Sequence, residues 1–88
     1  MKKPKELERL FKGAANHRRI AILMTVDQNE GIVLEELAAE LGANLKTVSQ
    51  HTCSLVHAGL LHKKYHARQV THFLSPYGKA FLKFMGSF

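Results

Sequence analysis

The sequence predicts a mainly α-helical fold with a small β-hairpin wing, the winged helix-turn-helix class, and three observations support this. Apolar residues recur at helical spacing over residues 34–41, and Gly42 follows in the position of a helix C-terminal stop. Only two residues later Asn44 can cap another helix, and two helices joined by so short a turn must cross steeply. After Gly59 the apolar period becomes that of two strands, which indicates a hairpin.

The part of the chain before this motif predicts two helices and one short strand. Pro4 suits a first helical turn, and apolar side chains follow it at helical spacing: Leu7, Leu10, Phe11 and Ala14. Asn16 is a good N-cap for a second helix, whose inward-facing residues we expect to be Ile20, Leu23, Met24 and Val26. A polar turn then leads to a strand of Ile32 and Val33.

The second helix of the helix-turn-helix, residues 45–57, divides into an apolar and a polar face. Four positions form its expected inner face: Leu45, Val48, Thr52 and Leu55. The polar side chains of its N-terminal half are left to project: Lys46, Thr47, Ser49, Gln50 and His51. In this motif the N-terminal half of the second helix is the part that enters the major groove of DNA.

The hairpin consists of two expected strands, residues 60–66 and 69–75, joined by a short loop at residues 67–68. A tight loop pairs side chains on one face of the hairpin: Leu61 with Leu74 and Tyr65 with Val70. Cationic side chains cluster toward its tip: Lys63, Lys64, His66 and Arg68. Ser75 and Pro76 then begin a last helix, which carries Ala80, Phe81, Phe84 and Met85.

The composition favours a nucleic-acid partner over a membrane. The formal net charge is +6, and all seven carboxylates lie between Glu6 and Glu40, so one end of the molecule is strongly positive. No apolar run approaches the length of a membrane span, and the basic N-terminus leads into an amphipathic pattern rather than a signal peptide. The lone Cys53 cannot form an internal disulfide, which suits a reducing cytoplasm. We expect residues 1–88 to form one domain.

Five segments in order resemble the ArsR-type winged-helix repressors. Residues 10–20 resemble the opening of that family, residues 36–42 its first DNA-reading helix, and residues 47–51 its recognition helix. Residues 58–61 are similar to the exit from that helix, and residues 74–78 to the family's Leu-Thr-Pro-x-Gly signature. The resemblance implies the winged-helix fold, binding of double-stranded DNA, and a homodimer formed through the first and last helices. Here those helices carry a surplus of apolar side chains: Leu7, Leu10, Phe11, Phe81, Phe84, Met85 and Phe88.

The chain also departs from the family's pattern. Metal-sensing members often carry a Cys-x-Cys motif in the first DNA-reading helix or Asp and His ligands on the last helix, and this sequence has neither. Metal sensing is therefore not implied, and we expect no cofactor. Thr52 stands where the family usually has a buried Leu, so we expect a slightly looser core. Ala67 replaces the usual glycine at the wing tip, which disfavours a tight type I′ turn.

We predict that the DNA contacts come from the recognition helix and the wing. The expected contact residues are Asn44, Lys46, Thr47, Ser49, Gln50, His51, Lys63, Lys64, His66 and Arg68. Gln can bind adenine through two hydrogen bonds, Lys can bind guanine, and Ser or Thr can bind phosphate or base.

Three alternatives are weaker. The uncharged C-terminal half of the recognition helix is compatible with a winged-helix module that binds protein or RNA. Cys53 and His57, spaced i, i+4, could both ligate a metal ion, but no set of three or four ligands with recognised spacing is visible. An enzyme is not predicted, because there is no glycine-rich phosphate loop or nucleophile elbow and Asp27 is the only aspartate.

Overall fold

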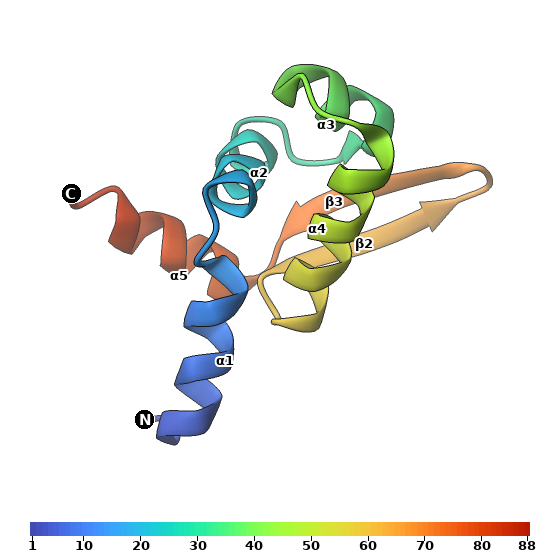
Figure 1. The fold of residues 1–88 in the computed structure, drawn as a ribbon. Helices are drawn as coiled ribbons and strands as arrows, with labels where there is room; N and C mark the ends of the chain where they lie inside the picture. The colour runs from blue at the N-terminus through green and yellow to red at the C-terminus, as the bar shows by residue number, and fades with distance from the viewer.

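The computed structural model describes all 88 residues and has the element order that the sequence predicts. The elements are α1 (Pro4–Ala14), α2 (His17–Gln28), β1 (Ile32–Val33), α3 (Leu34–Leu41), α4 (Leu45–His57), β2 (Leu61–His66), β3 (Gln69–Leu74) and α5 (Pro76–Met85). Figure 1 shows α3 and α4 joined by a short turn, with the β2–β3 hairpin extending to one side and α5 to the other. No helix combines the length and the apolar character needed to cross a membrane.

Local interactions set the geometry of the α3–α4 turn. Gly42 adopts a left-handed conformation with φ +58°, and the backbone N–H of Ala43 donates to the Ala38 carbonyl at 3.1 Å, which closes the end of α3. Asn44 then caps α4, because its side-chain oxygen accepts hydrogen bonds from the backbone N–H groups of Lys46 and Thr47 at 2.8 and 3.3 Å. The helix-turn-helix predicted from Gly42 and Asn44 is therefore confirmed.

The sheet is antiparallel and has three strands in the order β1-β3-β2. The predicted register of the hairpin is confirmed: Leu61 pairs with Leu74 and Tyr65 with Val70. At the base of the hairpin β2 begins one residue later than expected, at Leu61, and β3 ends one residue earlier, at Leu74. Ser75 is outside β3 because it caps α5, where its hydroxyl accepts from the Gly78 N–H at 3.0 Å. β1 pairs with β3 through Ile32 and His72, a partner that the sequence did not reveal.

The tip of the wing is a two-residue loop, because His66 pairs with Gln69. Ala67 adopts a left-handed φ of +53°, whereas Arg68 has no positive φ. A type I′ turn needs positive φ at both loop residues, so the expectation that the tip is not of this type is confirmed. Ala67 nevertheless takes the strained conformation that glycine adopts more readily.

The core lies between the helices and the inner face of the sheet. Its buried side chains come from α1 to α4 and the three strands, while α5 packs Phe81, Leu82 and Met85 partly buried against it. The largest that are completely enclosed include Ile22, Leu23, Leu37, Leu55, Leu60 and Leu61. Thr52 is also fully buried, and its hydroxyl donates to the Ser49 carbonyl at 2.9 Å. A satisfied hydroxyl can occupy an apolar core at modest cost, which explains how Thr52 fits there.

Two expected core residues are at the surface. Met24 is 51% exposed, because the buried face of α2 is formed by Ile22 and Val26, and a residue two positions from each lies on the opposite side of a helix. Leu45 is 45% exposed, since it is the first residue of α4 and burial along this helix begins a turn later, at Val48. The predicted inward positions of Met24 and Leu45 are therefore wrong.

Candidate nucleic-acid interface

The N-terminal half of α4 presents polar side chains that differ in how freely they project. Lys46 and Gln50 are exposed, while Thr47 and Ser49 are half-buried. Asn44 is exposed, but its side-chain oxygen is already engaged as the helix cap. Lys46 and Gln50 therefore have the side chains best able to reach a partner in front of this helix.

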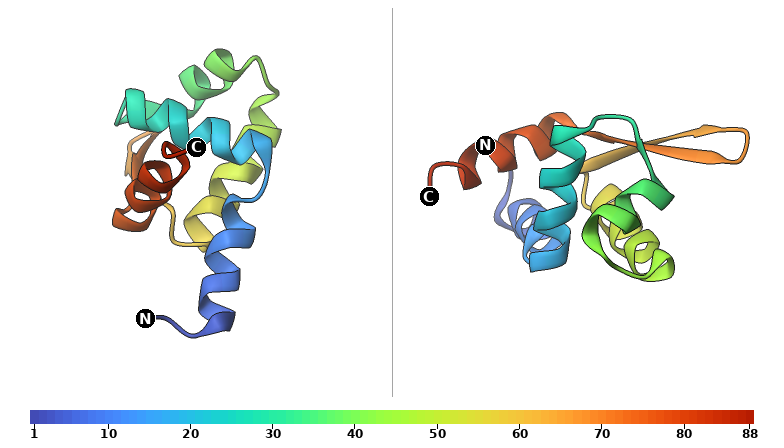
Figure 2. Two further views of the ribbon diagram at one scale, coloured as in Figure 1. Left: turned by 90° about the vertical axis from the view of Figure 1, so that its left-hand side faces the viewer. Right: turned by 90° about the horizontal axis from the view of Figure 1, so that it is seen from above.

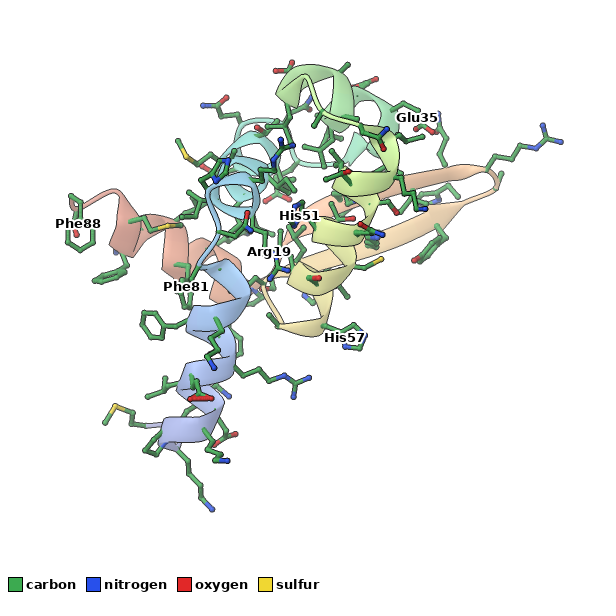
Figure 3. The ribbon with its side chains drawn as sticks, in the orientation of Figure 1. Arg19, Glu35, His51, His57, Phe81 and Phe88 are labelled. Carbon is green, nitrogen blue, oxygen red and sulfur yellow. The ribbon has the colours of Figure 1, made fainter.

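His51 is turned toward α2 instead of projecting as the sequence suggested. Its Nδ1 accepts a hydrogen bond from Arg19 Nε at 3.2 Å, and Arg19 also donates to the Gly13 carbonyl at 3.2 Å. Figure 3 shows Arg19 and His51 together between the two helices. Burial lowers the pKa of His51, and the nearby charges of Arg19, Arg18 and His17 lower it further. His51 is therefore neutral at pH 7 and holds α4 against α2.

The cationic side chains of the wing divide between its two faces. Neighbouring residues of a strand point to opposite sides of a sheet, so Lys63 lies on one face and Lys64 on the other. Lys63 Nζ lies 3.3 Å from Cys53 Sγ on α4, whereas Lys64 Nζ lies 4.8 Å from the ring centroid of Phe73. The single basic cluster expected at the tip is therefore split, and only Lys63 faces the recognition helix.

Two residues outside the expected set of contacts belong to this region. Tyr65 is 73% exposed and lies on the same face of the wing as Lys63, where strand alternation could have identified it. Arg19 orients His51 from α2, and no local pattern signals this contact because 32 residues separate the two positions.

The positive charge is concentrated in the half of the chain that contains the interface. Residues 41–88 carry six Lys and Arg and no Asp or Glu, whereas residues 1–40 carry seven of each, so the formal net charge of +6 belongs to residues 41–88. The one ion pair within 4 Å joins Lys12 to Glu8 on α1. The cations of α4 and the wing thus have no carboxylate partner, which suits a surface that meets phosphates.

The histidines do not form a metal centre with the other potential ligands. No group of three or more His, Cys, Asp or Glu side chains is arranged to hold a metal ion. His72 is fully buried, and its Nδ1 donates to the Ile32 carbonyl at 2.9 Å, while His62 and His66 lie on the opposite face of the hairpin. Cys53 is exposed and contacts Lys63.

An apolar surface lies on the side formed by α1 and α5. Phe11 and Phe84 are each 52% exposed, and Phe88 is 91% exposed. The rings of Phe11 and Phe81 meet edge to face with centroids 5.0 Å apart, and Figure 3 shows Phe81 next to α1. Leu10, also expected on this surface, is only 8% exposed and belongs to the protein's own core, because it lies on the face of α1 turned toward the other helices.

Figure 2 shows how these surfaces are arranged. In the view from above, α5 and the hairpin extend in opposite directions, and α4 lies beside the base of the hairpin. The apolar surface of α1 and α5 is thus separate from the polar surface formed by α4 and the wing.

No protein-family model matches the chain, and no curated protein sequence matches it. Several solved structures are similar to the chain. HlyU from Vibrio cholerae is 31% identical with a TM-score of 0.85, over 97% of this chain and 94% of that one. The transcriptional regulator HlyU from Vibrio vulnificus is 31% identical with a TM-score of 0.80, over 94% and 86%. A homodimeric winged helix-turn-helix DNA-binding domain from Mycobacterium bovis, of a possible ArsR-family transcriptional regulator, is 26% identical with a TM-score of 0.81, over 94% and 76%.

Proposed function

The chain belongs to the ArsR-type winged helix-turn-helix transcriptional regulators, and on that basis we propose that it is a repressor that binds specific double-stranded DNA sequences as a homodimer. The observation that carries this proposal is the exposed, carboxylate-free surface of α4 and the wing. A helix of this kind enters the major groove, and unpaired cations beside it neutralise phosphates.

We assign base reading to the first two turns of α4. Gln50 is exposed, and its amide can both donate to and accept from one adenine, an interaction worth roughly 1–3 kcal/mol against a wrong base. Lys46 suits guanine, and Thr47 and Ser49 suit phosphate or base. His51 acts differently: it keeps α4 in place through Arg19, so we assign it a positioning role.

We assign the phosphate contacts to the wing. Lys63 faces α4 and is the principal candidate, while Arg68 and His66 at the exposed tip reach further along the duplex. Lys64 lies on the far face over Phe73 and contributes less. These contacts hold the protein on DNA and carry no sequence information of their own.

We place the dimer interface on α1 and α5. Half-exposed aromatic rings there, Phe11 and Phe84, are the kind of side chain that interfaces bury. The Mycobacterium bovis relative is homodimeric, which supports the same assembly here. Phe84→Glu should convert the dimer into a monomer of about half the sedimenting mass, because a carboxylate in the apolar interface would lose its hydration. A dimer that persists in this variant at micromolar concentration would place the interface elsewhere.

Selection of bound duplexes from random DNA tests the function directly. We expect a palindromic consensus whose half-sites are about one helical turn apart or a multiple of it. Gln50→Ala should relax preference at one base pair of each half-site without changing the salt dependence, whereas a uniform loss over all duplexes would restrict Gln50 to backbone contact. If no duplex is enriched and the residual affinity for DNA does not depend on salt, the result would favour a module that binds protein instead.

A further inference from the structure

A cavity of about 250 Å³ lies between α2 and the helix-turn-helix, apart from the surfaces assigned to DNA bases and to the dimer. Its apolar wall comes from α2, α3, the α3–α4 turn and α4, with the side chains of Ala21, Ile22, Leu41, Ala43 and Val48. Its polar side consists of His17 and Arg18 from the first turn of α2 and His51 from α4. A volume slightly below the range of drug-sized sites, with an apolar wall and a few polar groups, suits a small amphipathic ligand.

The polar side of this cavity is positively charged and has no counter-charge. No carboxylate lines it, and Arg18 has no ion-pair partner. Burial, and then the charges of Arg19 and Arg18, lower the pKa of His51, which is the direction expected where cationic groups lie close together without a carboxylate. Because His51 Nδ1 accepts from Arg19, the proton of the neutral ring is on Nε2, which is a hydrogen-bond donor. The cavity thus provides both hydrogen-bond donors and positive charge for an anion.

We propose that this cavity binds a small organic carboxylate with an apolar body, about eight non-hydrogen atoms in all, the number that the volume accommodates at the density of a liquid. The carboxylate lies beside Arg18 and His51, and the apolar body fills the space against Ile22, Leu41 and Val48. A phosphate of the DNA backbone would satisfy the cations but leave this apolar wall uncovered. The apolar wall therefore favours a small molecule over the duplex itself.

Binding at this position lowers the affinity for DNA, an effect that rests on the proposed function. The cavity is bounded by the α3–α4 turn, through Gly42 and Ala43, and by His51 of the recognition helix. A bound carboxylate adds negative charge beside a helix that approaches phosphates, and the two anions repel each other. It also stabilises the protonated form of His51, in which Nδ1 carries a proton and no longer accepts from Arg19, so the contact that holds α4 against α2 is weakened. The protein then releases its operator when the carboxylate accumulates.

Hexanoate is the probe, titrated into the protein without DNA and followed by the NMR signals of the Gly42 amide and the His51 ring. We expect saturable shifts with a dissociation constant of about 1 mM or lower, typical of a ligand of this size. The pKa of His51 should rise when hexanoate is bound, because an anion next to the ring stabilises its charged form. Hexanamide, which lacks the charge, and acetate, which lacks the apolar body, should both bind more weakly.

Two variants and a matched control separate charge from shape. Arg18→Gln should weaken hexanoate binding about threefold to fivefold, as expected for one partly exposed charge pair. Ala21→Leu fills the cavity and should abolish binding with the charges unchanged, and its circular dichroism shows whether the fold is retained. Lys79→Gln removes an equal charge from the exposed surface of α5 and should leave hexanoate binding unchanged.

Four results would overturn the assignment of this cavity. They are the absence of saturable shifts, equal binding of hexanamide, equal binding of dimethyl phosphate, and an Arg18→Gln variant that binds as well as the wild type. Dimethyl phosphate represents the DNA backbone, so its success would assign the cations to DNA. Unchanged DNA affinity at saturating hexanoate would refute the regulatory effect. If hexanoate binds as expected but no duplex is bound at all, the proposed function fails while the binding site stands.

Discussion

The two adjacent lysines of the wing provide the sharpest test of how this protein meets DNA. If α4 lies in the major groove and the wing follows the next part of the duplex, a phosphate strand passes over the junction of the two. Lys63 lies at that junction, with its ammonium 3.3 Å from Cys53 on α4. Lys64 points to the opposite face, where its ammonium lies 4.8 Å from the centroid of Phe73. Lys63→Gln and Lys64→Gln remove the same charge at neighbouring positions, so they are matched variants.

The expected difference follows from counterion release. Each phosphate contact contributes about −0.9 to the slope of log affinity against log salt, and a dimer has two wings, so Lys63→Gln should reduce the slope by about 1.8. Between about 50 and 200 mM salt, the advantage of the wild type over this variant should therefore shrink about twelvefold. Lys64→Gln should leave the slope nearly unchanged, because its ammonium does not face the phosphate strand.

Fluorescence anisotropy with a labelled operator duplex measures both slopes at four or more salt concentrations. Thermal unfolding of each variant serves as the control, because loss of the contact between Lys64 and Phe73 can cost up to about 1 kcal/mol of stability. If Lys64→Gln reduces the slope as much as Lys63→Gln, the two faces of the wing are not distinguished by DNA. The docking geometry inferred from Lys63 would then be incorrect.

Three predictions concern the fold. Ala67→Gly should raise the free energy of unfolding by about 1 kcal/mol, because the left-handed φ of +53° strains alanine but not glycine, and a lower urea midpoint would contradict this. Gly13→Ala should lower it by about 1–3 kcal/mol, because the added Cβ would overlap the Cβ of Ala58 where α1 meets α4, and adding Ala58→Gly should restore part of the loss. Burial, and then the charge of Lys63, lower the pKa of His72, so stability should be complete above about pH 6.5 and decrease below it by at most about 1.4 kcal/mol per pH unit for this group. A variant without the ring, His72→Asn, should show a smaller decrease in urea unfolding at the same pH values, and an equal one would assign the pH dependence to other groups.

The elements whose causes are local could be predicted from the amino-acid pattern. Gly42 ends α3 and Asn44 caps α4 through hydrogen bonds to residues within a few positions, so both could be predicted. The register of the hairpin follows in the same way from a period-two pattern and a two-residue loop. Most of the elements, their order and the position of the recognition helix therefore came from neighbouring residues alone.

The side chains that are free to contact a partner are set by the packing of distant segments. Met24 was expected in the core and is at the surface, whereas Leu10 was expected on the apolar surface and is in the core, because burial depends on which elements cover a helix as well as on its own period. His51 is engaged by Arg19, 32 positions away, and His72 joins β3 to β1 through Ile32, 40 positions away. Such contacts depend on how distant segments pack together, and the local pattern of a single chain does not contain that information.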